Sequence, residues 1–233
     1  MTDIAANLTS VKRRIANAAN RAGRDPDAIT LVAVSKVHPA SAIREAYEAG
    51  QRHFGENYAQ ELRDKAMELS DLEGIRWHFI GHLQRNKAKL VAPAVSLVET
   101  VDSPRLIEEL ARQAERSARK IACLVQVNVG QEEQKSGCEE GEAETLVQAI
   151  EGAPGLQPVG LMTIPPWDLD AEETRVYFKA LYRLREALGG AARLPQLSMG
   201  MSHDFEEAVE EGATFVRVGT AIFGTRRPRR GRG

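Results

Sequence analysis

The chain repeats one pattern about eight times: a short apolar run typical of a buried β-strand, followed by a segment with apolar residues at helical spacing. The clearest helical segments fall near residues 106–114 and 177–188. Strands that alternate with helices in this way pair in parallel and are joined by crossover helices. The predicted strands are 29–35, 52–55, 76–80, 95–99, 121–128, 156–162, 196–199 and 214–218, of which 52–55 rests mainly on its place in the series.

Two architectures accommodate such an alternation. A chain of 233 residues with eight units has the size of a (β/α)₈ barrel. The alternative, a doubly wound open sheet, carries a glycine-rich phosphate loop after its first strand, whereas this first strand ends in Ser35-Lys36 with no glycine nearby. The sequence therefore predicts an α/β protein built as a single (β/α)₈ TIM barrel, with one domain over residues 1–225.

One segment at each end of the chain lies outside the strand–helix repeat. Apolar residues recur at helical spacing between Ile4 and Ala18, which predicts an extra N-terminal helix that Thr2 or Asp3 can cap. Residues 226–233, "RRPRRGRG", form an arginine-rich tail that we expect to be disordered.

The charge and the cysteine content narrow the function classes. The net charge is −2, and because the tail holds five arginines the rest of the chain carries −7, which argues against nucleic-acid binding by the barrel. No segment has the pattern of a signal peptide or a membrane span, and Cys123 and Cys138 lack metal-type spacing. His78 and His82 are four residues apart, but on a strand that runs into a loop, which disfavours a metal pair. We expect a cytoplasmic protein without a metal.

Polar residues and glycines cluster where the predicted strands end, which is the rim at which barrels of this class bind ligands. The sharpest case is "ITLVAVSKVHP" at 29–39, in which Lys36 follows an apolar strand. Desolvation there disfavours the ammonium and lowers the lysine pKa, and a neutral amine forms a Schiff base with an aldehyde. The alternative is a lysine whose amine reaches out to water.

The end of the chain supplies the parts of a phosphate site. In "VRVGTAIFG" at 216–224, the backbone N–H groups of Gly219 and Thr220 and the threonine hydroxyl suit a phosphate dianion, and barrels often bind phosphate after strands seven and eight. Gly200 in "SMGMS" allows a close backbone approach, and Ser198 or Ser202 can donate a further hydrogen bond. For each serine or glycine alone the alternative is an ordinary turn, but their joint occurrence with Lys36 disfavours that alternative.

Arg217 lies two residues before Gly219 on the last strand, so both side-chain positions face the interior of the barrel. Its guanidinium there can hydrogen-bond a ring nitrogen, although a surface or ion-paired arginine is an equal alternative. A lysine, a phosphate pocket and a partner for a pyridine nitrogen together suit pyridoxal 5'-phosphate.

Several strings carry a resemblance over nearly the whole chain: "LVAVSK" at 31–36, "FGENYAQE" at 54–61, "WHFIGHLQRNK" at 77–87, "LSMGMS" at 197–202 and "VRVGTAIFG" at 216–224. With these the sequence resembles the pyridoxal phosphate homeostasis (YggS/PROSC) family, which is similar to the barrel domain of alanine racemase. The resemblance implies that Lys36 holds the cofactor as a Schiff base, that Ser198, Gly219 and Thr220 bind its phosphate, that Arg217 faces the pyridine nitrogen, and that Asn57 lies near the ring.

The resemblance implies a carrier of pyridoxal phosphate rather than an enzyme. Racemases of this fold add a second, β-rich domain and an opposite-face tyrosine, for which this sequence leaves no residues, and an arginine at the pyridine nitrogen weakens the cofactor as an electron sink. We therefore expect a monomer that buffers vitamin B6 or delivers it to apo-enzymes, and so affects amino- and keto-acid balance indirectly. A racemase or decarboxylase and, more remotely, a Schiff-base aldolase are the alternatives. Lys135, in the loop after the fifth strand, is expected to be an ordinary surface lysine.

Overall fold

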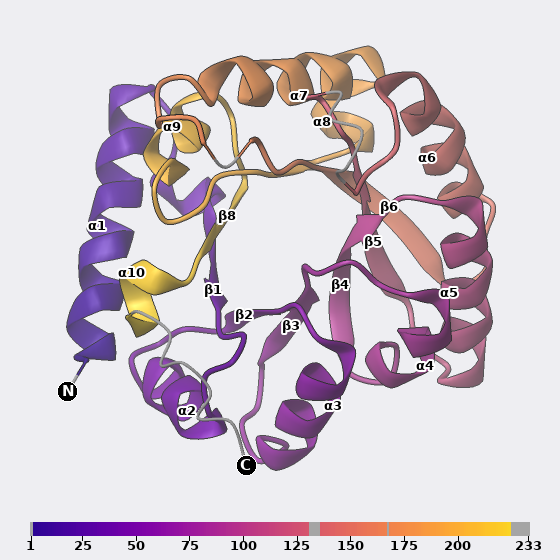
Figure 1. Cartoon of the computed structure of the whole chain (residues 1–233), viewed down its shortest axis with the longest axis horizontal. Coiled ribbons are helices and arrows are strands. Elements are labelled where there is room, and N and C mark those ends of the chain that lie inside the picture. Colours follow the sequence, from indigo (N-terminus) through magenta and orange to yellow (C-terminus); the bar gives the residue numbers. More distant parts are fainter. Residues whose placement is uncertain (1, 131–135, 167, 225–233) are drawn as a thin grey trace.

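Eight strands form a closed parallel barrel (Figure 1). The structure, a computed structural model, describes residues 2–130, 136–166 and 168–224. Within them each strand pairs with the next, and the last strand pairs with the first, which confirms the predicted (β/α)₈ barrel and excludes an open sheet. The strands are β1 (Thr30–Val34), β2 (His53–Glu56), β3 (Arg76–Phe79), β4 (Val95–Val101), β5 (Ile121–Gln126), β6 (Leu156–Met162), β7 (Gln196–Ser198) and β8 (Phe215–Val218).

Helices surround the strands on the outside (Figure 1). None of the described helices combines the length and the apolar character needed to cross a membrane. The predicted tail 226–233 and Lys135 lie outside the described residues. The helices are α1 (Ile4–Arg21), α2 (Ala40–Glu48), α3 (Ala59–Glu68), α4 (Ala88–Val91), α5 (Pro104–Arg116), α6 (Ala143–Glu151), α7 (Arg175–Ala187), α8 (Gly190–Arg193), α9 (Phe205–Glu210) and α10 (Thr220–Phe223).

The predicted N-terminal helix is confirmed as α1, which packs against α2, α9 and α10. Its buried side chains follow the predicted spacing from Ile4 to Ala18. Of the two candidate caps, Asp3 is the one used, because its Oδ1 accepts the N–H of Ala6 at 2.9 Å.

Loss of this cap has a defined expected effect. Replacing Asp3 with alanine leaves the N–H of Ala6 without its partner, so we expect the free energy of unfolding to fall by about 1 kcal/mol. Urea denaturation of the variant and the wild type measures the difference. No change in the unfolding midpoint would contradict the assigned cap.

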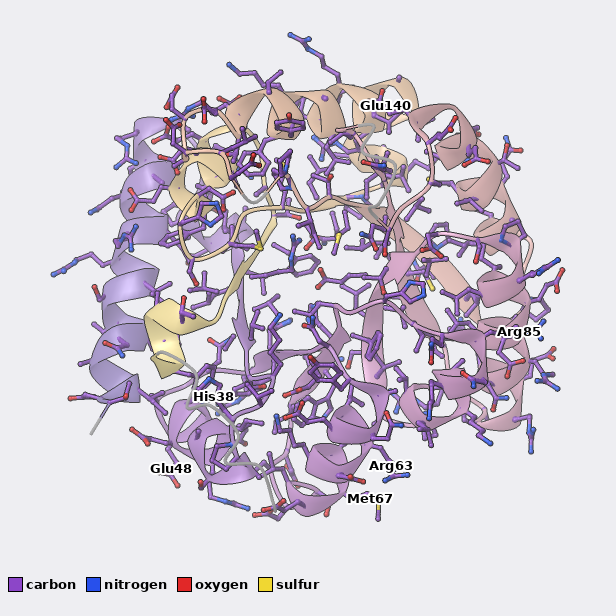
Figure 2. The ribbon with its side chains drawn as sticks, viewed as in Figure 1. His38, Glu48, Arg63, Met67, Arg85 and Glu140 are labelled. Carbon is purple, nitrogen blue, oxygen red and sulfur yellow. The ribbon has the colours of Figure 1, made fainter. Side chains whose placement is uncertain are left out.

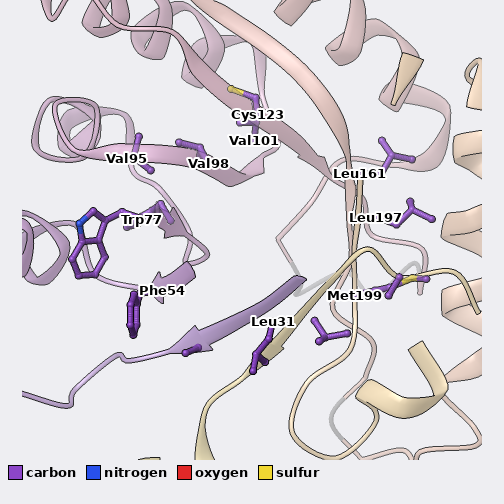
Figure 3. Packing of buried hydrophobic residues seen from close by; sticks show 14 of the residues in the cluster. Leu31, Phe54, Trp77, Val95, Val98, Val101, Cys123, Leu161, Leu197 and Met199 are labelled. Carbon is purple, nitrogen blue, oxygen red and sulfur yellow. The ribbon is translucent and has the colours of Figure 1, made fainter. Parts of the chain in front are cut away.

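The strands separate two apolar regions. Side chains that point outward pack under the helices, among them Leu31, Phe54 and Cys123 (Figure 3). Burial raises the pKa of the Cys123 thiol to about 12, so this cysteine is a packing residue. The inward-facing layer is smaller and is made by Val32, Leu97, Leu124, Met162 and Phe215. Above this layer the interior opens at the carboxyl ends of the strands.

Candidate functional site

A cavity of about 450 Å³ lies at the carboxyl ends of the strands. Its volume is in the range of cavities that bind small cofactors. It combines one amine, one guanidinium, one imidazole, one amide and several hydroxyl and backbone groups with apolar walls. The lining residues are Val34, Lys36, Asn57, Ile80, Ile164, Met201, Ser202, His203, Arg217, Gly219 and Thr220.

The turn after β1 holds Lys36 at this cavity. Val37, the next residue, adopts a φ of 63° in the left-handed region, which a β-branched side chain rarely occupies. The N–H of Val37 donates to Glu61 Oε1 of α3 at 2.8 Å. On the other side of Lys36, the N–H of Ser35 donates to the backbone oxygen of Gly55 in β2 at 3.0 Å. Because the residues before and after Lys36 are both held, the direction in which the lysine leaves the backbone is restricted.

A buried ion pair lies next to this turn. Lys65 Nζ donates to Glu56 Oε1 at 2.7 Å, to Glu61 Oε1 at 2.9 Å and to the backbone oxygen of Ser35 at 2.8 Å. The hydroxyl of Ser35 donates to the same Glu56 oxygen at 2.7 Å. Burial raises the pKa of Glu56 to about 7, against the lowering effect of Lys65. The pair thus ties β1, β2 and α3 together where Lys36 emerges.

Arg217 is buried on the inner side of β8, where it lines the cavity. Its Nη1 donates to Ser198 Oγ at 2.6 Å, and its Nη2 donates to the backbone oxygen of Thr163 at 2.8 Å. Burial lowers the pKa of the guanidinium, and the charges of Glu99 and Asp204 act in the opposite direction. The two hydrogen bonds fix the plane of the guanidinium beneath the cavity.

The loops after β7 and β8 meet at the cavity beside the turn after β1, because β8 pairs with both β1 and β7. The N–H of Gly219 donates to Ser202 Oγ at 3.2 Å, and Thr220 follows at the start of α10. Gly200 has a φ of 90°, and a Cβ there would lie 2.5 Å from Cβ of Ala208, which explains why glycine is needed. His38, in the turn after β1, lies beside α10 (Figure 2), and its ring centroid is 5.1 Å from that of Phe223.

Asn57, directly after β2, has a side-chain oxygen that is buried without a hydrogen-bond partner among the described residues. Its backbone passes so close to Gly81 that a Cβ there would lie 2.2 Å from the Asn57 carbonyl oxygen. An unpaired buried amide oxygen in a cavity wall is available to a ligand that donates a hydrogen bond.

Five of the six predicted site residues line this one cavity: Lys36, Asn57, Arg217, Gly219 and Thr220. Ser198 does not, because it is fully buried beneath the cavity between Arg217 and Glu99. Of the two serines that the sequence offered, Ser202 is the one on the wall. The two histidines considered as a metal pair have separate surroundings: His78 is buried beside Glu99, and His82 is exposed, with its Nδ1 3.8 Å from Asp102.

Sequence reasoning gave no role to Glu56, Glu61, Lys65 or Glu99. Glu56 and Glu61 belong to the quoted string "FGENYAQE", and Glu99 lies in the fourth strand, where it begins the string "ETVDS". Their sequence signal is a carboxylate inside or directly after an apolar strand. A carboxylate at such a position is rarely buried without a partner.

Known proteins resemble this chain over nearly its whole length. The sequence profile of the alanine racemase N-terminal domain matches residues 6–227. The pyridoxal phosphate homeostasis protein of Escherichia coli K12 is 44% identical over 231 residues, covering 97% of this chain and 98% of the relative. That of Pseudomonas aeruginosa is 44% identical over 227 residues, covering 97% of each.

Solved structures extend the comparison. PipY of Synechococcus elongatus PCC7942 with PLP bound superposes with a TM-score of 0.82 at 39% identity, covering 95% of this chain and 100% of PipY. Alanine racemase from Corynebacterium glutamicum shares the fold at 20% identity and a TM-score of 0.67, over 98% of this chain and 62% of the racemase. The chain therefore belongs to the alanine racemase N-terminal domain family and, within it, to the pyridoxal phosphate homeostasis proteins.

Proposed function

We propose that this protein binds pyridoxal 5'-phosphate in the cavity at the carboxyl ends of the strands and holds it as a Schiff base on Lys36. The observation that carries the proposal is the convergence on one cavity of a lysine, a buried arginine, an unpartnered amide oxygen and a hydroxyl-rich loop. The relatives named above and the PLP-bound PipY structure support it. The proposed binding unit is the barrel of residues 1–225.

The residues present suit the parts of this cofactor. Lys36 would condense with the aldehyde, forming a C=N bond and releasing water. Ser202, Gly219 and Thr220 would surround the phosphate, and the guanidinium of Arg217 would donate to the ring nitrogen. The unpaired oxygen of Asn57 suits a hydroxyl donor such as the one on the pyridine ring. What the bound cofactor supplies is an electrophilic carbon next to an electron-accepting ring.

We further propose that the protein carries the cofactor without turnover. Arg217 has only N–H donors to offer, so it favours a ring nitrogen without a proton, which is the weaker electron sink. The relatives are named for homeostasis rather than for a reaction, which agrees with this role. A carrier of this kind would act in the cytoplasm, keep free pyridoxal phosphate low, deliver it to apo-enzymes and so influence amino- and keto-acid levels.

An amino-acid racemase or decarboxylase is the second candidate. The observation that favours it is His203, which lines the cavity and lies 3.4 Å from Asp204, giving the site a titratable group besides Lys36. Incubation of the pyridoxal phosphate-loaded protein with L-amino acids, with D-isomers and CO₂ measured, separates the two candidates. Turnover well above that of free pyridoxal phosphate would support the enzyme.

The carrier proposal makes a direct prediction for Lys36. After loading with pyridoxal phosphate and reduction with borohydride, we expect the wild type to carry a pyridoxyl group on the peptide that contains Lys36. The Lys36→Ala variant has no amine at that position, so the reduced label at the site is lost. Mass spectrometry of the digested protein locates the label.

Lys12→Ala is the matched control, because Lys12 is an exposed residue on α1. It should be labelled like the wild type. A Lys36→Ala variant with the full visible absorption of the wild type, or a wild type labelled only at other lysines, would refute the assignment of Lys36.

A further inference from the structure

A line of hydrogen bonds leads from the cavity into the interior of the barrel. Arg217 Nη1 donates to Ser198 Oγ at 2.6 Å, and the Ser198 hydroxyl donates to Glu99 Oε2 at 2.5 Å. The other oxygen of Glu99 lies 2.6 Å from His78 Nδ1, and His78 Nε2 lies 2.9 Å from His53 Nδ1. Five strands, β8, β7, β4, β3 and β2, contribute one residue each to this line, which we call the Glu99 line.

The Glu99 line lies among the inward-facing apolar side chains. The His78 ring packs edge-on against Phe215, with ring centroids 5.3 Å apart, and Glu99 is fully buried. Burial alone would raise the pKa of Glu99, but the hydrogen bond from His78 and the charges of His78 and Arg217 hold that pKa below its ordinary value. A buried carboxylate is expensive unless it is paired, so an apolar residue would close the barrel at lower cost.

The pattern of donors explains what the carboxylate does. Ser198 has one hydroxyl proton, and it is committed to Glu99, so the serine can only accept from Arg217. A guanidinium has five N–H donors, and Arg217 uses two of its nitrogens on Ser198 and on the Thr163 carbonyl. These two hydrogen bonds leave further N–H donors of Arg217 unused by Ser198 and Thr163, and Arg217 is a lining residue of the cavity. The carboxylate therefore sets the direction of the serine proton, and the serine sets the plane of the guanidinium.

We propose that Glu99, acting through Ser198, is the positioning residue that fixes Arg217 toward the aromatic ring nitrogen of the ligand and makes the site selective for a ring with an acceptor nitrogen. The inference rests on the proposed binding of pyridoxal phosphate. It also assigns Ser198 to the support of Arg217 rather than to the phosphate, and it leaves Ser202 as the serine of the phosphate loop. Among the described residues, His78 from β3 and Arg217 from β8 lie nearest to Glu99, with Arg217 Nη1 3.9 Å from Glu99 Oε2, and His53 from β2 also interacts with its charge. The charge of Asp204, directly before α9, also acts on Arg217.

The test compares two ligands on one protein. The probes are pyridoxal 5'-phosphate and its 1-deaza analogue, in which a C–H group replaces the ring nitrogen. The wild type should bind the analogue more weakly, because the Arg217 donor then has no acceptor. In Glu99→Gln the guanidinium is no longer held by a charge, so we expect the preference for the ring nitrogen to shrink by about tenfold. Labelling of Lys36 by borohydride reduction should persist.

Two further variants make the result decisive. Glu115→Gln changes an exposed carboxylate on α5 and should keep the preference of the wild type. Ser198→Ala removes the link without burying a new charge, so it tests the inference even if Glu99→Gln does not fold, and we expect its preference to shrink in the same direction.

The outcomes separate this inference from the proposed function. If both ligands lose affinity equally in Glu99→Gln and Ser198→Ala, Glu99 is merely structural and the inference is overturned. If the wild type itself never labels Lys36 with pyridoxal phosphate, the proposed function fails instead. A wild type that labels Lys36 but binds both ligands equally also overturns the inference.

Discussion

Replacing Lys65 with methionine should lower the free energy of unfolding by about 3–5 kcal/mol. Lys65 is buried and is the only cation within ion-pair distance of Glu56 among the described residues. Without it a buried carboxylate loses its counter-charge, which is among the most destabilising single changes in a protein interior. Urea denaturation followed by circular dichroism measures the effect.

The loss of unfolding free energy in Lys65→Met, relative to the wild type, should grow as the pH rises. A carboxyl whose folded-state pKa lies above its unfolded value contributes stability at low pH that is lost as the pH rises through the folded pKa. In the wild type, the stability that Glu56 contributes is therefore lost between about pH 4.5 and about pH 7. The variant lacks the lowering effect of Lys65, so its Glu56 pKa is higher still and the loss continues above pH 7. Denaturation at about pH 6 and about pH 8.5 should give a clearly larger difference from the wild type at the higher pH.

Two further variants test whether Lys65 stabilises the protein by pairing with Glu56. Lys12→Met, on the exposed face of α1, should leave the stability within about 0.5 kcal/mol of the wild type. Glu56→Gln combined with Lys65→Met removes both charges and should recover part of the loss at about pH 8.5. A double variant as unstable as the sum of the two single variants would mean that the two side chains do not act as a pair.

Replacing Gly81 with alanine should be the second large effect, with a loss of about 2–5 kcal/mol of stability and weaker ligand binding. The new Cβ would lie 2.2 Å from the carbonyl oxygen and 2.7 Å from the Cα of Asn57, and both are backbone atoms that cannot rotate away. The carbonyl of Gly81 is itself held by the hydroxyl of Thr100 at 2.6 Å. Relief of the clash must therefore displace Asn57 from the cavity wall.

Gly141→Ala is the matched control for Gly81→Ala, because no atom lies within 4 Å of a Cβ at Gly141 and its backbone does not need glycine. It should change the unfolding midpoint little. Thermal denaturation and titration with pyridoxal phosphate measure both variants. A Gly81→Ala protein with the stability and affinity of Gly141→Ala would show that the loop adapts without moving Asn57.

The barrel and most of the cavity wall are predictable because they follow from local periodicity. Apolar runs, and for 52–55 its place in the series, put the eight predicted strands within about two residues of their observed ends, and parity on the last strand puts Arg217 inside the barrel. Lys36 is recognisable because a charged residue at the end of an apolar strand is unusual. The strand positions, the inward side of Arg217 and the unusual position of Lys36 are all properties of short stretches of chain.

The contacts beneath the cavity are not predictable in this way. Ser198 and Glu99 are separated by 99 positions, and they meet across the barrel interior from strands that are not neighbours. Sequence spacing fixes which side of a strand a residue faces, but not which side chains reach one another across the interior. For the same reason the sequence offers both Ser198 and Ser202 as phosphate ligands, whereas in the structure Ser202 lines the cavity and Ser198 lies between Arg217 and Glu99.

Closure of the barrel affects how the chain can fold while it is being synthesised. Strand β1 needs β8 as its second neighbour, and Thr30 pairs with Phe215, near the end of the chain. During synthesis β1 therefore keeps one unpaired edge until β8 has left the ribosome, and α1 cannot pack against α9 and α10 before these helices have been made. Such an edge is a template for misassociation, so the nascent chain should depend on chaperones for longer than an open-sheet protein of the same size.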